Sequence, residues 1–187
     1  MNHEEHHGSP ADSARPQLSA EDGERVQLGI RCAQQIKTYG NWLNWLAGLI
    51  VLYVLFLKTA GFYFPVGRTY IPNYLHQVLM QSNPGVSDDS LALILILGLA
   101  AVFFMLGQLA VRTLKLAWLC LALGFLIYGA DLAALYWLHF MKNNHYLDLV
   151  IGIEAAFHLF VLAMFALGVI AGLRYNAVAR KEMFAQY

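Results

Sequence analysis

Four long apolar runs are the feature of this sequence that most limits what the chain can become. They cover residues about 42–62, 91–111, 116–138 and 149–173. Each reaches the roughly 20 residues that a helix needs to cross the hydrocarbon core of a bilayer. Charged residues make up only 13% of the chain, against about 25% in a soluble globular domain. The sequence therefore predicts an all-α integral membrane protein with four transmembrane helices.

The rest of the chain divides around these runs. Residues 1–20 contain histidines, acidic residues and prolines without an apolar period, which predicts a disordered cytoplasmic tail. Residues 21–40 place apolar and basic residues at helical spacing, which predicts a short juxtamembrane amphipathic helix lying along the bilayer. A solvated linker is the alternative for this segment. The four-span bundle then occupies 41–175, with a long outer loop at 63–90, and a second cytoplasmic tail follows at 176–187.

The connections and their basic residues predict the topology. The short sequence RTLK between the second and third runs forces an antiparallel hairpin, so we expect an antiparallel bundle. Basic residues favour the cytoplasmic side of a membrane. Eight of them lie near the run ends on the side of both termini and three on the other side: Arg25, Arg31, Lys37, Arg112, Lys115, Arg174, Arg180 and Lys181 against Lys58, Arg68 and Lys142. We therefore expect a multi-pass protein of a bacterial-type inner (plasma) membrane with both termini in the cytoplasm.

Four ionisable residues, Lys58, Asp131, Glu154 and His158, interrupt the apolar runs at similar depth. Counted inward from the outer run ends at the helical rise, they lie about 6 to 12 Å deep. Glu154 and His158 are four positions apart, so they share one face of a helix. Charges inside a bilayer are costly. We therefore expect a polar network in the outer half of the bundle, in which one acid shares a proton or pairs with a cation.

Small residues indicate which helix faces meet protein. Gly168 and Gly172 share a face with Glu154, and two glycines four positions apart let helices approach closely. Gly124 shares a face with Asp131 in the third run. We expect these three glycines at helix contacts, with the polar residues facing the same protein interior.

Two functional interpretations remain open at this stage. The first is a non-catalytic accessory or scaffolding membrane subunit, in which the network fixes helix register and the outer loop and juxtamembrane helix contact other subunits or a second copy. The second is a metal-binding or proton-translocating protein that uses the network. A divalent metal would then be held by Glu154, His158 and Asp131, completed by a loop histidine such as His139.

The composition limits which classes of partner and cofactor the sequence predicts. The 12 basic and 12 acidic residues balance, so the basic excess of a nucleic-acid-binding protein is missing and the bilayer is the first partner. No HExxH or CxxC motif occurs, and Cys32 and Cys120 lie far apart in the sequence. A divalent metal is therefore the cofactor that the sequence favours, and no catalytic residue is predicted. Haem between His139 and His158 is the weaker alternative, because the two histidines differ in depth by roughly 12 Å. No charged segment leading into an apolar run opens the chain, which predicts no cleavable signal peptide.

Overall fold

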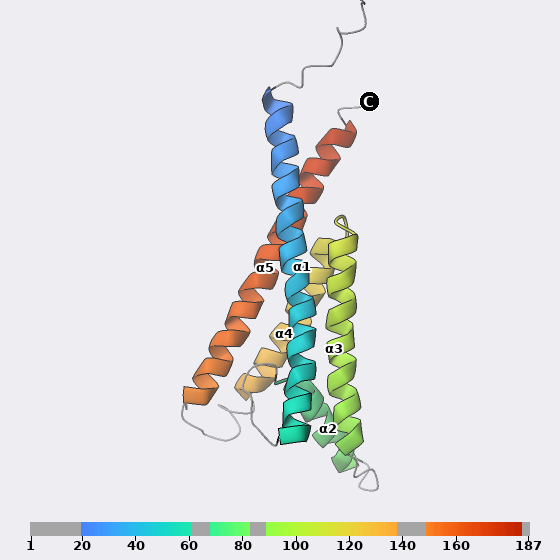
Figure 1. Ribbon diagram of the computed structural model, residues 1–187, viewed down its shortest axis with the longest axis vertical. Coiled ribbons are helices and arrows are strands. Elements are labelled where there is room, and N and C mark those ends of the chain that lie inside the picture. The colour runs from blue at the N-terminus through green and yellow to red at the C-terminus, as the bar shows by residue number, and fades with distance from the viewer. Residues whose placement is uncertain (1–19, 61–67, 83–88, 138–148, 185–187) are drawn as a thin grey trace, which may run out of the picture.

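The computed structural model describes residues 20–60, 68–82, 89–137 and 149–184, and the regular elements in these ranges are helices. They are α1 (Ala20–Ala60), α2 (Ile71–Ser82), α3 (Asp89–Arg112), α4 (Ala117–Tyr136) and α5 (Leu149–Phe184). Figure 1 shows α1, α3, α4 and α5 as long helices, with the short α2 at one end. α2 lies within the outer loop that the sequence predicts at 63–90.

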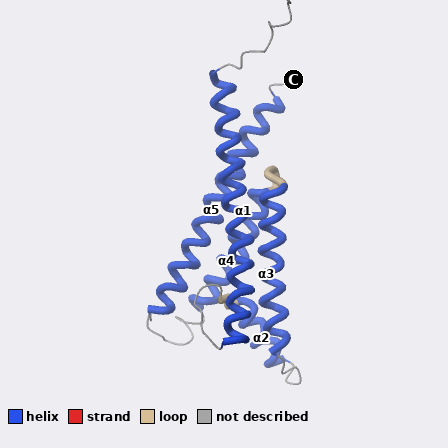
Figure 2. Tube along the Cα trace, viewed as in Figure 1, coloured by secondary structure: helices blue, strands red, loops and turns tan. Residues whose placement is uncertain are grey.

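The four long helices alternate in direction along the chain. In Figure 1, α1 runs from top to bottom, α3 returns upward, α4 descends and α5 ascends. The turn between α3 and α4, tan in Figure 2, is closed by a hydrogen bond of 3.0 Å from the Leu116 N–H to the Thr113 carbonyl. α1 packs on α3 and α5, and α4 packs on α5 and α3. The short turn thus places two long helices beside each other, as the RTLK sequence predicted.

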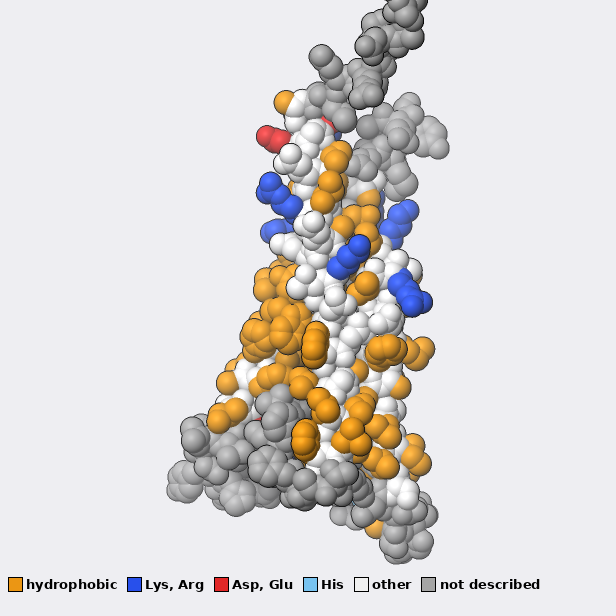
Figure 3. All heavy atoms as spheres, viewed as in Figure 1, with side chains coloured by type: hydrophobic (Ala, Val, Ile, Leu, Met, Phe, Trp, Pro, Cys, Tyr) orange, Lys and Arg blue, Asp and Glu red, His pale blue; other side chains and the backbone are white. Residues whose placement is uncertain are grey.

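Within the described residues, four helices are long and apolar enough to cross a membrane. The segments concerned lie in Ala20–Phe56, Ser90–Arg112, Ala117–Tyr136 and Gly152–Arg180. Figure 3 shows apolar side chains over the middle and lower parts of the visible face, with Lys and Arg side chains gathered toward the end where α1 begins and α5 ends. This distribution is consistent with a small membrane protein.

α1 differs from the expectation for the first part of the chain. It is a single helix of 41 residues, so it is about 60 Å long, roughly twice the hydrocarbon core. The predicted juxtamembrane helix at 21–40 and the predicted first span belong to this one helix, which continues in the same direction (Figure 1). At the predicted boundary α1 packs closely on α3, because a Cβ atom at Gly40 would lie 2.9 Å from the Val111 Cγ2 atom.

α1 and α5 together extend past the turn between α3 and α4. Gly40 lies beside the end of α3, and the Asn176 side-chain amide donates to the Lys115 carbonyl in the turn at 2.9 Å. Residues 20–39 of α1 and 177–184 of α5 therefore form a projecting helix pair, which we call the stalk. Its helices contact each other, since a Cβ atom at Gly29 would lie 3.7 Å from Val178 Cγ1. α5 thus continues well beyond the predicted end of the fourth span at residue 173.

Close contacts between the long helices also lie at all three glycines singled out from the sequence: Gly124, Gly168 and Gly172. All three are buried. A Cβ atom would lie 2.8 Å from Tyr39 Cβ of α1 at Gly168, 2.9 Å from the Trp118 nitrogen of α4 at Gly172, and 2.7 Å from Leu43 Cδ2 of α1 at Gly124. A methyl group at these positions would force neighbouring atoms to move.

Replacing Gly172 with alanine is expected to destabilise the protein by about 1–3 kcal/mol, the usual cost of overpacking. The added methyl group would meet the backbone of Trp118, which cannot rotate away. Gly152→Ala is the matched control in the same helix, because nothing lies within 4 Å of the added atom there. Denaturant titration of the detergent-solubilised variants would measure both effects, and equal stabilities would contradict the packing described.

Candidate functional site

The start of α2 is held by a carboxylate from another helix. The backbone N–H groups of Tyr70 and Ile71 both donate to Asp131 Oδ1 of α4, each at 2.8 Å. The first N–H groups of a helix have no partner within that helix, and Pro72 contributes no N–H at all. Asp131, which is only 1% exposed, therefore acts as an N-terminal cap for α2 from some 60 residues away.

The side chain of Tyr70 continues this contact to a second helix. Its hydroxyl group donates to Glu154 Oε2 of α5, and Glu154 is also 1% exposed. The Tyr74 N–H then donates to the Tyr70 carbonyl at 2.9 Å, which begins the regular helix. We call the contacts of Tyr70 and Ile71 with Asp131 and Glu154 the Tyr70 anchor. It ties α2 to α4 and α5 through three hydrogen bonds.

His158 lies one turn along α5 from Glu154, at the boundary between the Tyr70 anchor and the apolar core. Its ring centroid lies 4.9 Å from that of Tyr128, with 30° between the planes, and 6.2 Å from that of Tyr70. Tyr128 in turn contacts Phe103 and Phe165 edge to face, each at 6.1 Å. The imidazole is therefore packed between aromatic rings and only 2% exposed.

Two buried polar atoms of this cluster have no hydrogen-bond partner among the described residues. They are Asp131 Oδ2 and His158 Nδ1. An unsatisfied buried polar atom costs about 1–3 kcal/mol. The carboxylate oxygen can take up a proton or accept a hydrogen bond. The imidazole Nδ1 atom can donate or accept a hydrogen bond, depending on which ring nitrogen carries the proton.

The predicted network and the observed cluster overlap in three residues. Asp131, Glu154 and His158 are all buried, and they surround the segment that begins α2. The side chain of Lys58, the fourth predicted member, lies outside the described residues. Tyr70, which the sequence interpretation did not include, joins the two carboxylates. The signal that could have drawn attention to it is the proline two positions later, since proline marks helix starts.

The predicted metal ligands are placed only in part. Glu154, His158 and Asp131 lie in the described helices, whereas His139 does not belong to the described residues. Within the described part of the chain, no three His, Cys, Asp or Glu residues gather closely enough to hold a metal ion. The metal interpretation stays a prediction.

Comparison with known proteins adds no family to this description. No family model matches the chain, and no curated protein or solved structure is significantly similar to it.

The capping role of Asp131 leads to a direct test. Asp131→Ala removes the acceptor of two buried N–H groups, so we expect a loss of about 1–3 kcal/mol per unsatisfied group in unfolding free energy. Asp131→Asn is the matched control, because its side-chain carbonyl oxygen can still accept both bonds. Amide hydrogen exchange at Tyr70 and Ile71 should become fast in the alanine variant and stay slow in the asparagine variant. Unchanged protection in both variants would contradict the cap.

Proposed function

We propose that this chain is a non-catalytic accessory or scaffolding subunit of a membrane-protein assembly, and that the stalk is the surface that contacts its partner. The observation that carries the proposal is the extension of α1 past the α3–α4 turn. Residues 20–39 reach about 30 Å beyond it at the helical rise. The packing of α1 on α3 does not require this length, because α3 ends at Arg112, next to the Val111 side chain that lies against Gly40.

The side chains of the stalk support a binding role. Cys32 and Ile36 are buried, so they hold the stalk together. Val26 and Ile30, four positions apart on another face, are 43% and 54% exposed. Apolar side chains that stand outside a bilayer are stabilised when a partner covers them. The basic residues on this side of the molecule predict that the partner is met in the cytoplasm, next to an inner (plasma) membrane.

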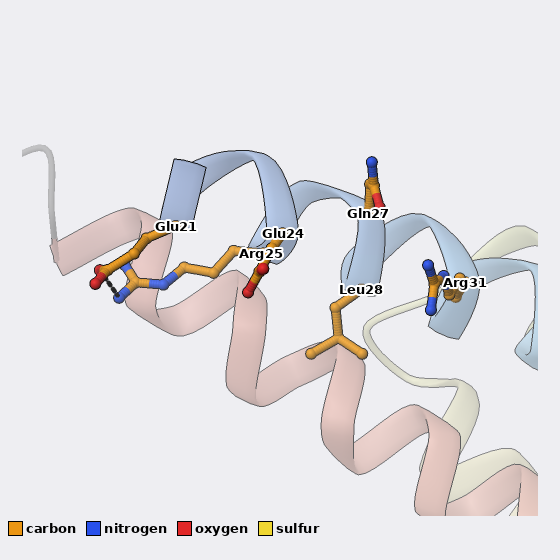
Figure 4. Close-up of a pocket in the computed structure, with 6 residues that line it drawn as sticks. All are labelled: Glu21, Glu24, Arg25, Gln27, Leu28 and Arg31. Atoms are coloured by element: carbon orange, nitrogen blue, oxygen red, sulfur yellow. Dashed lines mark ion pairs between the residues drawn. The ribbon is translucent and has the colours of Figure 1, made fainter. Parts of the chain in front are cut away.

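A polar hollow lies along another face of the stalk. Its volume is about 720 Å³, and Figure 4 shows the lining residues along the first turns of α1: Glu21, Glu24, Arg25, Gln27, Leu28 and Arg31. Arg25 pairs with Glu21 at 3.6 Å within this hollow. Charges of both signs beside an exposed leucine suit a protein partner better than a nucleic acid.

The buried cluster supports the same proposal from the other end of the molecule. Asp131 and Glu154 both hold Tyr70, so the Tyr70 anchor gives each carboxylate a role in fixing α2. A carboxylate used in this way needs no contact with solvent or with a transported ion. In a non-catalytic subunit, the Tyr70 anchor stabilises the fold and the stalk binds the partner subunit.

Site-specific photo-crosslinking tests the proposal. A photoreactive amino acid at Ile30, in the full-length protein in its native membrane, is expected to give a discrete adduct. The same amino acid at Met105 of α3, which is 70% exposed within a candidate span, is the control for contacts with bulk membrane protein. An adduct of twice the 20.9 kDa chain mass would identify a second copy, and another discrete mass a different subunit. Adducts at Ile30 no more discrete than those at Met105 would contradict the proposal.

A second candidate function is metal binding or proton translocation through Asp131, Glu154 and His158. The unpartnered Asp131 Oδ2 and His158 Nδ1 atoms favour it, because both can exchange a proton. In proteoliposomes under a pH gradient, this alternative expects proton flux in the wild type and its loss in Glu154→Gln. A stoichiometric divalent metal that disappears in His158→Ala would also support it.

The accessory-subunit proposal expects a different result from the same variant. Glu154→Gln keeps a side-chain oxygen that can accept a hydrogen bond from the Tyr70 hydroxyl group. The variant should therefore fold with only a small loss of stability, and wild type and variant should both leak protons no faster than protein-free liposomes. Flux in the wild type that the substitution abolishes would favour the alternative.

A further inference from the structure

The depth at which α2 begins is fixed by the Tyr70 anchor. Asp131 lies five residues before the end of α4 at Tyr136, and Glu154 lies five residues after the start of α5 at Leu149. Five residues correspond to about 8 Å along a helix. Because Tyr70 contacts both carboxylates, α2 starts below the ends of these two helices and not above them.

The end of α4 carries the side chains expected at a membrane surface. Tyr136 and Trp137 are 57% and 59% exposed. Aromatic residues with one polar atom concentrate at the level of the lipid headgroups. A segment that starts about 8 Å below them lies at the boundary between headgroups and acyl chains. Non-helical backbone at this depth needs protein partners for its polar groups, and Asp131 supplies them to Tyr70 and Ile71.

The faces of α2 differ in character around the helix. At the helical angle per residue, Tyr74, Leu75, Val78 and Leu79 share an arc of about 140°. Each of the four is between 40% and 45% exposed. His76 and Met80 point the opposite way and are only partly exposed, which is the side that packs on α3 and α4.

One flank of α2 is polar, and the helix carries no charged side chain. Gln77 and Gln81 lie on one flank, between the apolar arc and the packed side, and both are exposed. The sequence of α2, IPNYLHQVLMQS, has no lysine, arginine, aspartate or glutamate. The helix thus has one face for the bundle, one apolar face and one polar flank.

We propose that α2 lies in the membrane interface, with Tyr74, Leu75, Val78 and Leu79 against the acyl chains of the leaflet on its side and Gln77 toward water. Lipid is the occupant that the depth of the helix selects, because the Tyr70 anchor holds the start of α2 below the aromatic end of α4. The exposed apolar arc supports the same occupant, since an interfacial helix inserts by burying its apolar face. The proposal stands independently of the role of the stalk.

Lipid quenching of a fluorescent label tests this placement. Val78→Cys and Gln77→Cys place an environment-sensitive fluorophore on the apolar face and on the polar flank at the same level of α2. The native Cys32 and Cys120 are buried at 2% and 3% exposure, so unmodified protein serves as the labelling blank. The full chain is reconstituted in phosphatidylcholine vesicles with and without bromine atoms on the upper part of the acyl chains. Quenching by brominated lipid should be severalfold stronger at position 78 than at position 77.

The remaining outcomes overturn the proposal. Equal quenching at both positions would mean that the apolar arc does not face lipid. A fluorophore at position 78 with blue-shifted emission that brominated lipid leaves unquenched would mean that a protein surface, such as a second copy, covers the arc. Leu75→Cys repeats the measurement on the same face, so that a misfolded Val78 variant cannot decide the result.

Discussion

The organisation of the α2 side of the molecule depends on the hydrogen bonds of Tyr70. A short helix such as α2 begins with backbone N–H groups that have no partner within the helix itself. Asp131 accepts two of these groups, and the Tyr70 hydroxyl reaches across to Glu154. Two consecutive residues, Tyr70 and Ile71, thereby tie the start of α2 to both α4 and α5.

The surroundings of the Tyr70 anchor explain how acids are tolerated inside an apolar bundle. His158 and Tyr128 form a layer of rings between the carboxylates and the packed apolar core around Phe165. Such amphipathic rings present a polar edge to one side and apolar surface to the other. The polar groups are gathered at one level of the bundle, while glycine contacts hold the helices together farther along.

Different parts of this structure could be predicted from the sequence to different degrees. The four long helices could be predicted because a run of about 20 apolar residues has few alternatives to a span. The inward faces of α4 and α5 follow from helical spacing, which places Asp131 with Gly124 and Glu154 with Gly168. Tyr70 could not be predicted, because it lies 61 and 84 positions from its two partners and its local sequence is the same whether docked or solvated. The close contact of α1 with α3 at Gly40 likewise joins segments far apart in the sequence, which no local pattern encodes.

The unbroken α1 has a mechanical consequence. α1 continues as one helix from the stalk into the four-helix packing, so the two parts share a single helix axis. Leu43 and Ile50 are fully buried on the same helix that exposes Ile30. A partner that turned the stalk would therefore also shift the side chains at the centre of the bundle. The close contacts at Gly40 and Gly168 hold α1 against α3 and α5 at the level where the stalk joins the four-helix packing.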